Sequence, residues 1–138
     1  MNIYFAGSIK GGRDDREIYA EIIAELKKYG TVLTEHIGFD WITNKGETQI
    51  PQEEVFRRDV EMLAKADVVV AEVTQKSLGV GYELGRAEAI GKPILALYRG
   101  AKQDLSAMIA GNPYITLACY TEPTDIPGLL KTFLEHQS

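Results

Sequence analysis

The chain has 138 residues, a formal net charge of −5 and one cysteine. We expect residues 1–138 to form a single domain, because a chain of this length builds one ordinary hydrophobic core. The acidic balance argues against a protein that coats nucleic acid, since neutralising phosphates requires clustered Lys and Arg. It remains compatible with a small anionic ligand, because a local pocket can oppose the global charge.

The sequence also constrains the compartment. The single cysteine, Cys119, excludes an intrachain disulfide, which fits a reducing cytoplasm. It lies in an apolar run, so we expect it in the core as a small hydrophobic residue. No signal peptide is visible, and no apolar run is long enough to span a bilayer. We therefore expect a cytoplasmic protein without membrane contact.

Short apolar runs alternate with amphipathic segments along the chain. In chain order we expect a strand at residues 1–6, a helix at 13–29, a strand at 31–34, a helix at 52–66, a strand at 67–73, a helix at 82–90, a strand at 93–98, a short helix at 105–110, a strand at 114–120 and a helix at 126–135. The run at 67–73 is almost continuously apolar, which is typical of a strand buried on both faces.

Five strands that alternate with helices predict a parallel sheet covered on both faces. Right-handed crossovers restrict the topology, and a doubly wound, flavodoxin-like α/β fold is the simplest arrangement. Ligands of such folds bind at the carboxyl ends of the strands where the strand order reverses, here between the first and third strands. Two unusual loops, at residues 7–13 and 77–81, follow these strands. Pattern and topology therefore indicate one site.

The loop at residues 7–13 is suited to phosphate. It supplies three glycines, the Ser8 hydroxyl and the cations Lys10 and Arg13, and it leads into a helix. Glycine lets backbone N–H groups approach an anion, and the helix N-terminus adds partial positive charge. Ser77 and Gly79 of the second loop would add further donors. The alternative is an ordinary Gly-rich turn with solvated cations, since the spacing is not that of a P-loop.

The segment at residues 37–51 is long for a loop in a compact α/β domain. It contains Phe39 and the only tryptophan, Trp41. Such loops are often lids or binding loops, so these rings either cover a ligand or pack on the surface. His36, just before this loop, contacts a base or sugar or makes a structural hydrogen bond.

Glu83 is the first candidate catalytic residue. It opens the expected helix at 82–90 and shares helical spacing with four apolar residues, Val80, Leu84, Ala87 and Ile90. Glu83 should therefore point with the apolar face. A fixed, partly desolvated carboxylate near a helix N-terminus suits nucleophilic attack on an electrophilic carbon. The alternative is a glutamate that only complements the helix dipole.

Asp59 is the second candidate. It falls on the apolar stripe of the expected helix at 52–66, which comprises Val55, Phe56, Met62, Leu63 and Ala66. More outward positions are occupied by Arg57, Arg58, Glu61 and Lys65. A charge on a buried stripe costs free energy unless it is paired or used. The alternative is a structural aspartate bonded to the backbone or to an arginine.

Two inward carboxylates beside a phosphate loop suggest glycosidic chemistry. One attacks or stabilises the oxocarbenium-like carbon, and the other protonates the leaving group. Glu35, Asp67 and Glu72 rank lower, because acids at strand ends often only cap or meet solvent. No Cys/His cluster has metal-ligand spacing and no Ser-His-Asp set is apparent, so we expect neither metal nor cofactor.

Six blocks of this sequence together resemble a known enzyme family. They are YFAGSI at residues 4–9, GGR at 11–13, TEH at 34–36, ADVVVAEVT at 66–74, SLGVGYELGRA at 77–87 and SAMI at 106–109. This combination resembles the 2'-deoxynucleoside 5'-monophosphate N-hydrolases, which belong with the nucleoside 2-deoxyribosyltransferases. The resemblance implies a homodimeric enzyme that releases a free base and (deoxy)ribose 5-phosphate.

The resemblance also implies roles for individual residues. Glu83 matches the nucleophile, Asp59 the acid that assists base departure, and Tyr4 a tyrosine that positions the nucleophile. Ser106 matches a serine that reaches the phosphate from the neighbouring subunit. The other matching substrate-binding residues are Gly7, Ser8, Ile9, Lys10, Gly11, Gly12, Arg13, His36, Ser77, Gly79 and Met108.

Some features leave alternatives open. Lys10 stands where arginine is common in the family, and the segment at 37–51 matches no known pattern, so base preference is undetermined. A 2-deoxyribosyltransferase would use the same nucleophile with a base as acceptor. A hydrolase of ribonucleotides is a second alternative, and a non-catalytic nucleotide-binding module is a third.

Overall fold

The computed structural model describes residues 1–8, 15–34 and 50–137. Its helices and strands, in chain order, are β1 (Asn2–Ala6), α1 (Arg16–Leu26), β2 (Thr31–Val32), α2 (Gln52–Lys65), β3 (Val68–Glu72), α3 (Leu78–Ala89), β4 (Ile94–Arg99), α4 (Ala107–Ala110), β5 (Thr116–Tyr120) and α5 (Ile126–Glu135). Two 3-10 turns, Lys102–Asp104 and Pro123–Asp125, precede α4 and α5.

The strands form one parallel sheet with the order β2-β1-β3-β4-β5. This order confirms the predicted doubly wound α/β fold. The order reverses between β1 and β3, which are hydrogen-bonded neighbours in the sheet. The carboxyl ends of these two strands therefore lie side by side, where such folds bind ligands.

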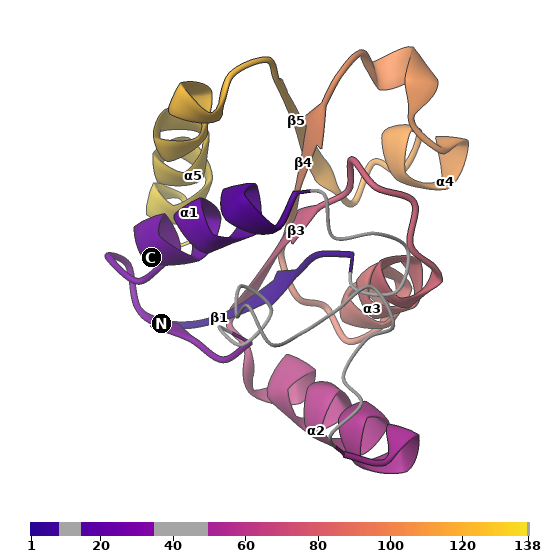
Figure 1. Ribbon diagram of the computed structural model, residues 1–138. Coiled ribbons are helices and arrows are strands. Elements are labelled where there is room, and N and C mark those ends of the chain that lie inside the picture. Colours follow the sequence, from indigo (N-terminus) through magenta and orange to yellow (C-terminus); the bar gives the residue numbers. More distant parts are fainter. Residues whose placement is uncertain (9–14, 35–49, 138) are drawn as a thin grey trace.

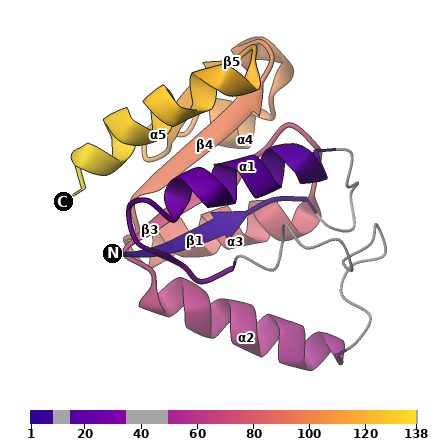
Figure 2. The same cartoon turned by 60° about the vertical axis from the view of Figure 1, so that its left-hand side comes forward.

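Helices cover both faces of the sheet, as Figures 1 and 2 show. Helices α1 and α5 pack on one face, and α2 and α3 pack on the other. Successive side chains of a strand point to opposite faces, so Val68 and Val70 contact the α1/α5 side while Val69 and Ala71 contact the α2/α3 side. This double burial explains why β3 is apolar along almost its whole length.

One helix starts earlier than predicted. Helix α3 begins at Leu78, not at residue 82, so the presumed loop at 77–81 is largely the first turn of this helix. Ser77 is its N-cap, and the Ser77 Oγ accepts a hydrogen bond from the Val80 N–H at 3.2 Å. A serine cap stabilises a helix start by about 1 kcal/mol, enough to offset roughly one glycine in the helix.

The edges of the sheet also differ from prediction. Strand β2 contains only Thr31 and Val32, and β5 begins at Thr116, two residues later than expected. Cys119 was wrongly predicted to lie in the core, because it is exposed. Strand β5 is an edge strand: Ala118 and Tyr120 face the core under α5, whereas Cys119 points to the opposite, uncovered side.

Within the described parts of the chain, no helix combines the length and apolar character needed to cross a membrane.

Candidate active site

Glu83 and Tyr4 meet on the α2/α3 side of the sheet. Tyr4 lies in the middle of β1 and is buried, and its hydroxyl donates a hydrogen bond to Oε2 of Glu83. Glu83 lies in the second turn of α3 and is partly buried. Its orientation with the apolar face agrees with the prediction for Val80, Leu84 and Ala87. Ile90 was wrongly assigned to that face, because it is exposed at the end of the helix.

The surroundings of Glu83 disfavour its charged form. Burial raises the pKa of Glu83 to about 7; the hydrogen bond from Tyr4 opposes this rise, and the nearby carboxylate of Asp59 adds to it. Burial also raises the pKa of Tyr4, and the carboxylates of Glu83 and Asp59 raise it further. Tyr4 therefore stays protonated and remains a hydrogen-bond donor at physiological pH.

Asp59 projects from α2 and leaves 28% of its side chain exposed. Its Oδ1 accepts a hydrogen bond from Nε of Arg58 at 3.0 Å and lies 2.9 Å from Nη2 of the same residue, with which it forms an ion pair. Arg58 therefore does not simply point outward as expected. Phe56 was also misplaced on a buried stripe, since it is 54% exposed. Among the residues of α2, only Leu63 is fully buried, so the N-terminal half of this helix forms a wall rather than part of the core.

This wall borders a cavity of about 1290 Å³ between α2, α3 and α4. Most predicted site residues that the structure describes line it: Tyr4, Gly7, Asp59, Ser77, Gly79, Glu83, Ser106 and Met108. Ser8 does not line this cavity; it is fully buried behind it. The predictions for Ile9, Lys10, Gly11, Gly12, Arg13, His36, Phe39 and Trp41 lie outside the described residues.

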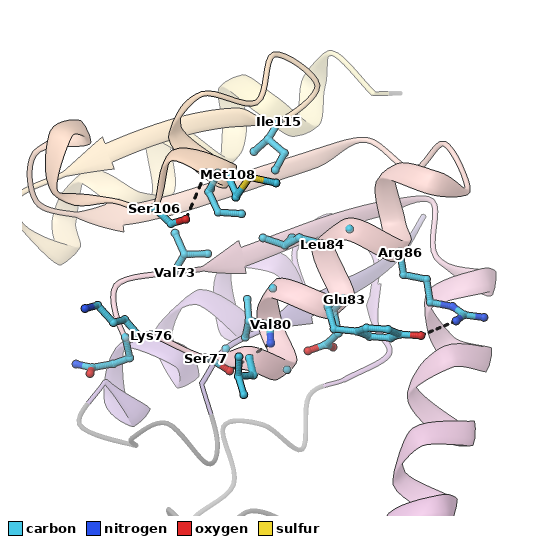
Figure 3. Close-up of a pocket in the computed structure, with 18 of the residues that line it drawn as sticks. Val73, Lys76, Ser77, Val80, Glu83, Leu84, Arg86, Ser106, Met108 and Ile115 are labelled. Atoms are coloured by element: carbon cyan, nitrogen blue, oxygen red, sulfur yellow. Dashed lines mark hydrogen bonds between the residues drawn. The ribbon is translucent and has the colours of Figure 1, made fainter.

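Figure 3 shows how the cavity is built from two sides. Ser77, Val80 and Glu83 come from the start of α3, and Ser106 and Met108 face them from α4. Ser106 is exposed and caps α4, with its Oγ accepting a hydrogen bond from the Met108 N–H at 3.3 Å. The cavity is therefore lined by two carboxylates, those of Glu83 and Asp59, and by the N-terminal ends of α3 and α4, each of which has a serine N-cap.

Gly7 shapes the end of β1 beside this cavity. A Cβ atom at this position would lie 3.0 Å from the Tyr19 ring on α1, which is closer than most real Cβ contacts. The glycine therefore lets the strand end approach α1 closely.

The sequence did not predict two features of the structure, one in the site and one on the opposite face of the sheet. Arg58 directly precedes Asp59, and its exposure was judged from helical spacing alone, which does not register a contact between adjacent side chains. Glu72 was expected to cap or meet solvent, but it is fully buried. It belongs to the α1/α5 side of the sheet, opposite Glu83, because alternate residues of β3 face opposite sides.

Residues 3–115 match a family model described as nucleoside 2-deoxyribosyltransferase. The chain belongs to this family. The match includes both carboxylates and the glycine-rich segment, and it confirms the resemblance inferred from the sequence blocks.

Two relatives named as N-hydrolases are similar to this chain over almost their full length. A Danio rerio protein named 5-hydroxymethyl-dUMP N-hydrolase is 48% identical over 139 aligned residues, covering 98% of this chain and 96% of the relative. A Syntrophotalea carbinolica protein named putative 2'-deoxynucleoside 5'-phosphate N-hydrolase 1 is 42% identical and covers 97% of this chain and 94% of the relative. These similarities place the chain among the N-hydrolase members of the nucleoside 2-deoxyribosyltransferase family.

A solved structure supports the fold. The Clostridium botulinum CMP N-glycosidase has a TM-score of 0.71 against this chain at 17% identity, and the superposition covers 96% of this chain and all of the other. At this identity the similarity concerns the fold alone.

Proposed function

We propose that this protein hydrolyses the N-glycosidic bond of (2'-deoxy)nucleoside 5'-monophosphates and releases a free base and (deoxy)ribose 5-phosphate. The named activities of the relatives support this class of reaction. The observation that carries the proposal is the meeting of Glu83, Tyr4 and Asp59 at one cavity. Two carboxylates and a tyrosine hydroxyl at one cavity are the groups that glycosidic chemistry uses, whereas a non-catalytic nucleotide-binding module does not need them.

The proposed reaction has two steps. In the first, Glu83 attacks C1' of the sugar, so a C1'–O bond forms as the C1'–N bond breaks, and Asp59 delivers a proton to the departing base. In the second, Asp59 takes a proton from water, and the resulting hydroxide displaces Glu83 from C1'. Tyr4 holds the Glu83 carboxylate in place through its hydroxyl. The predicted phosphate contacts at residues 7–13 would hold the other end of the nucleotide.

The first test is a substrate panel scored for free base by chromatography. We expect base release from deoxynucleoside 5'-monophosphates and much slower release from the matching nucleosides, because the phosphate loop binds only the former. A parallel set of ribonucleotides measures the preference at C2'. Adding a second free base distinguishes the 2-deoxyribosyltransferase alternative, which would yield an exchanged nucleoside. No base release from any compound would refute the proposed hydrolase.

We also propose that the protein acts as a homodimer in which Ser106 serves the neighbouring site. The cavity of about 1290 Å³ exceeds the 300–1,000 Å³ typical of small-molecule sites. Around it, Leu78 is 97% exposed and Met108 79% exposed, and Phe56 and Tyr82 are largely exposed as well. A contiguous apolar surface of this kind is typical of protein–protein contacts. A second copy would cover these side chains and close the outer part of the cavity.

Mixed dimers test this arrangement. Sedimentation should first show a dimer. Ser106→Ala should raise KM about tenfold, the size expected for losing a hydrogen bond to a charged group. Mixing Ser106→Ala with Glu83→Gln subunits should then restore sites that bind nucleotide with the wild-type KM, because a mixed dimer combines Glu83 of one subunit with Ser106 of the other. If the mixed dimers instead keep the raised KM of Ser106→Ala, Ser106 belongs to the site of its own subunit.

A cytoplasmic location remains part of this proposal. It is supported by the single cysteine, Cys119, which is free and exposed. An exposed thiol without a disulfide partner is typical of proteins in reducing compartments.

A further inference from the structure

A buried polar cluster lies at the carboxyl ends of β3, β4 and β5, on the sheet face opposite Glu83. Its centre is Glu72, which accepts hydrogen bonds from the Tyr120 hydroxyl, from the Thr74 N–H at 2.7 Å and from the Thr74 hydroxyl at 2.8 Å. The backbone N–H of Arg99 donates in turn to Oγ1 of Thr74 at 2.9 Å. Burial raises the pKa of Glu72, and the hydrogen bonds from Tyr120 and Thr74 limit that rise.

The Arg99 side chain links this cluster to the start of helix α1. Its Nη2 lies 2.9 Å from Oδ1 of Asp15, whose side chain is almost fully buried. Asp15 occupies the N-cap position of α1, where an aspartate normally accepts a hydrogen bond from its own helix. It makes no such side-chain bond here. The Asp15 side chain therefore pairs with Arg99 of β4 and does not cap its own helix.

Asp15 comes two residues after the glycine-rich segment at 7–13, and the structure also fixes the chain at the start of this segment, at Gly7 and Ser8. The Ser8 N–H donates a buried hydrogen bond to the Tyr19 hydroxyl of α1 at 3.1 Å. The Tyr19 ring also lies beside Gly7, where it leaves little room for a side chain. Among the described residues, the Ser8 Oγ and the Asp15 Oδ2 are buried and have no hydrogen-bond partner. Buried polar atoms of this kind are costly unless the neighbouring segment or its ligand satisfies them.

We propose that Arg99 is a positioning residue for recognition of the 5'-phosphate. It holds Asp15, which follows the predicted phosphate-binding segment at 7–13, and with it the start of α1, at a fixed place on the sheet. Small displacements of binding groups lower binding and rate strongly, by up to about 100-fold for 1 Å. Glu83 lies on the opposite face of the sheet, so the Arg99 contacts should affect phosphate binding and not bond cleavage. This inference rests on the proposed function.

The test is a double-mutant cycle on the ion pair in the full-length protein. The variants are Arg99→Gln, Asp15→Asn and the double substitution, and the probe is 2'-deoxyribose 5-phosphate, whose binding requires no turnover. We expect each single variant to weaken binding of this probe about tenfold, and the double variant to lose no more than either, because both remove one interaction. In nucleotide hydrolysis the same variants should raise KM and leave kcat almost unchanged.

The matched control is the exposed ion pair of Glu54 and Arg57 on α2, which does not line the cavity. Its neutral variants, Glu54→Gln and Arg57→Gln, should alter neither probe binding nor KM, since surface pairs contribute little. Thermal unfolding of all variants separates loss of folding from loss of positioning. Wild-type probe affinity in folded Arg99→Gln would overturn the inference. Failure of the hydrolase proposal would appear separately, as a wild-type protein that binds the probe but releases no base.

Discussion

Glu83→Gln should abolish base release, lowering kcat by about 10⁴-fold or more, as removing a catalytic nucleophile does. The amide oxygen cannot donate the electron pair needed to form the bond to C1' at a useful rate. Nucleotide binding should persist within a few-fold, because the substitution preserves size and the predicted phosphate contacts lie elsewhere. Free base measured by chromatography and nucleotide affinity measured by calorimetry check the two halves of this prediction.

The substitution removes the charge of Glu83 and should leave the geometry of the site unchanged. Glutamine keeps an oxygen that accepts the Tyr4 hydroxyl, so the hydrogen bond that orients the side chain survives. The control is Glu21→Gln, an exposed position on α1 at the other side of the sheet, which should retain wild-type turnover. Turnover that persists in Glu83→Gln while Glu21→Gln behaves normally would rule out Glu83 as the nucleophile.

The charge of Glu83 also sets an expected pH dependence. The attacking form is the carboxylate, and burial raises the pKa of Glu83 to about 7. Bond cleavage also needs a proton on Asp59, so the reactive form holds one proton on the pair of Glu83 and Asp59. The value of kcat/KM should therefore fall as pH rises above about 7, where the pair loses this proton, and fall again at low pH, where both groups are protonated. An alkaline fall near pH 4.5 would mean that the free enzyme exposes Glu83 to solvent.

The same pKa shift predicts a stability effect of defined sign. The folded-state pKa lies above the unfolded value, so the folded protein binds the Glu83 proton more tightly and loses stability as pH rises from about 4.5 to 7. The shift corresponds to roughly 3 kcal/mol in the free energy of unfolding at 1.36 kcal/mol per pH unit. Glu83→Gln removes this loss, so it should unfold at a higher temperature than the wild type at pH 8 and at a similar one at pH 4.

The sequence predicted those features that depend on local pattern. Alternating apolar runs and amphipathic segments gave the number and order of the strands, and the position of the strand reversal follows from that order. The inward orientation of Glu83 followed from its spacing relative to Val80, Leu84 and Ala87, because helical periodicity is a local property. The inward orientation of Asp59 was likewise inferred from helical spacing, but α2 follows β2, which is not a neighbour of β3, so the strand order did not predict that Asp59 and Glu83 line one cavity.

Features that depend on distant partners could not be predicted in this way. Asp15 and Arg99 are 84 residues apart, and Glu72 and Tyr120 are 48 apart, so no spacing rule relates them. Cys119 looked like a core residue because its run is apolar, but burial of an edge strand depends on which helices cover it. The start of α3 was predicted four residues too late, because the glycines at 79 and 81 indicated a loop and the capping potential of Ser77 was not considered.

Asp59→Asn should lower kcat/KM by about 10²- to 10⁴-fold, the range typical of losing a general acid. The amide keeps the size of the side chain and an oxygen for Arg58, but it has no proton to give to the departing base. The loss should therefore depend on the leaving group. A deoxynucleotide of 5-fluorouracil, whose electron-withdrawing fluorine stabilises the departing anion, should lose much less activity than the matching uracil nucleotide.

The leaving-group series distinguishes this role from a purely electrostatic one. Glu61→Gln, an exposed position on the same helix, is the control and should keep wild-type rates for both nucleotides. The charge of Asp59 contributes to the raised pKa of Glu83, so the activity that remains in Asp59→Asn should depend on ionisation of Glu83 alone and rise with pH, with a midpoint below pH 7. An equal loss for both bases, with the midpoint shifted, would mean that Asp59 tunes Glu83 electrostatically and that the proton for the base comes from elsewhere.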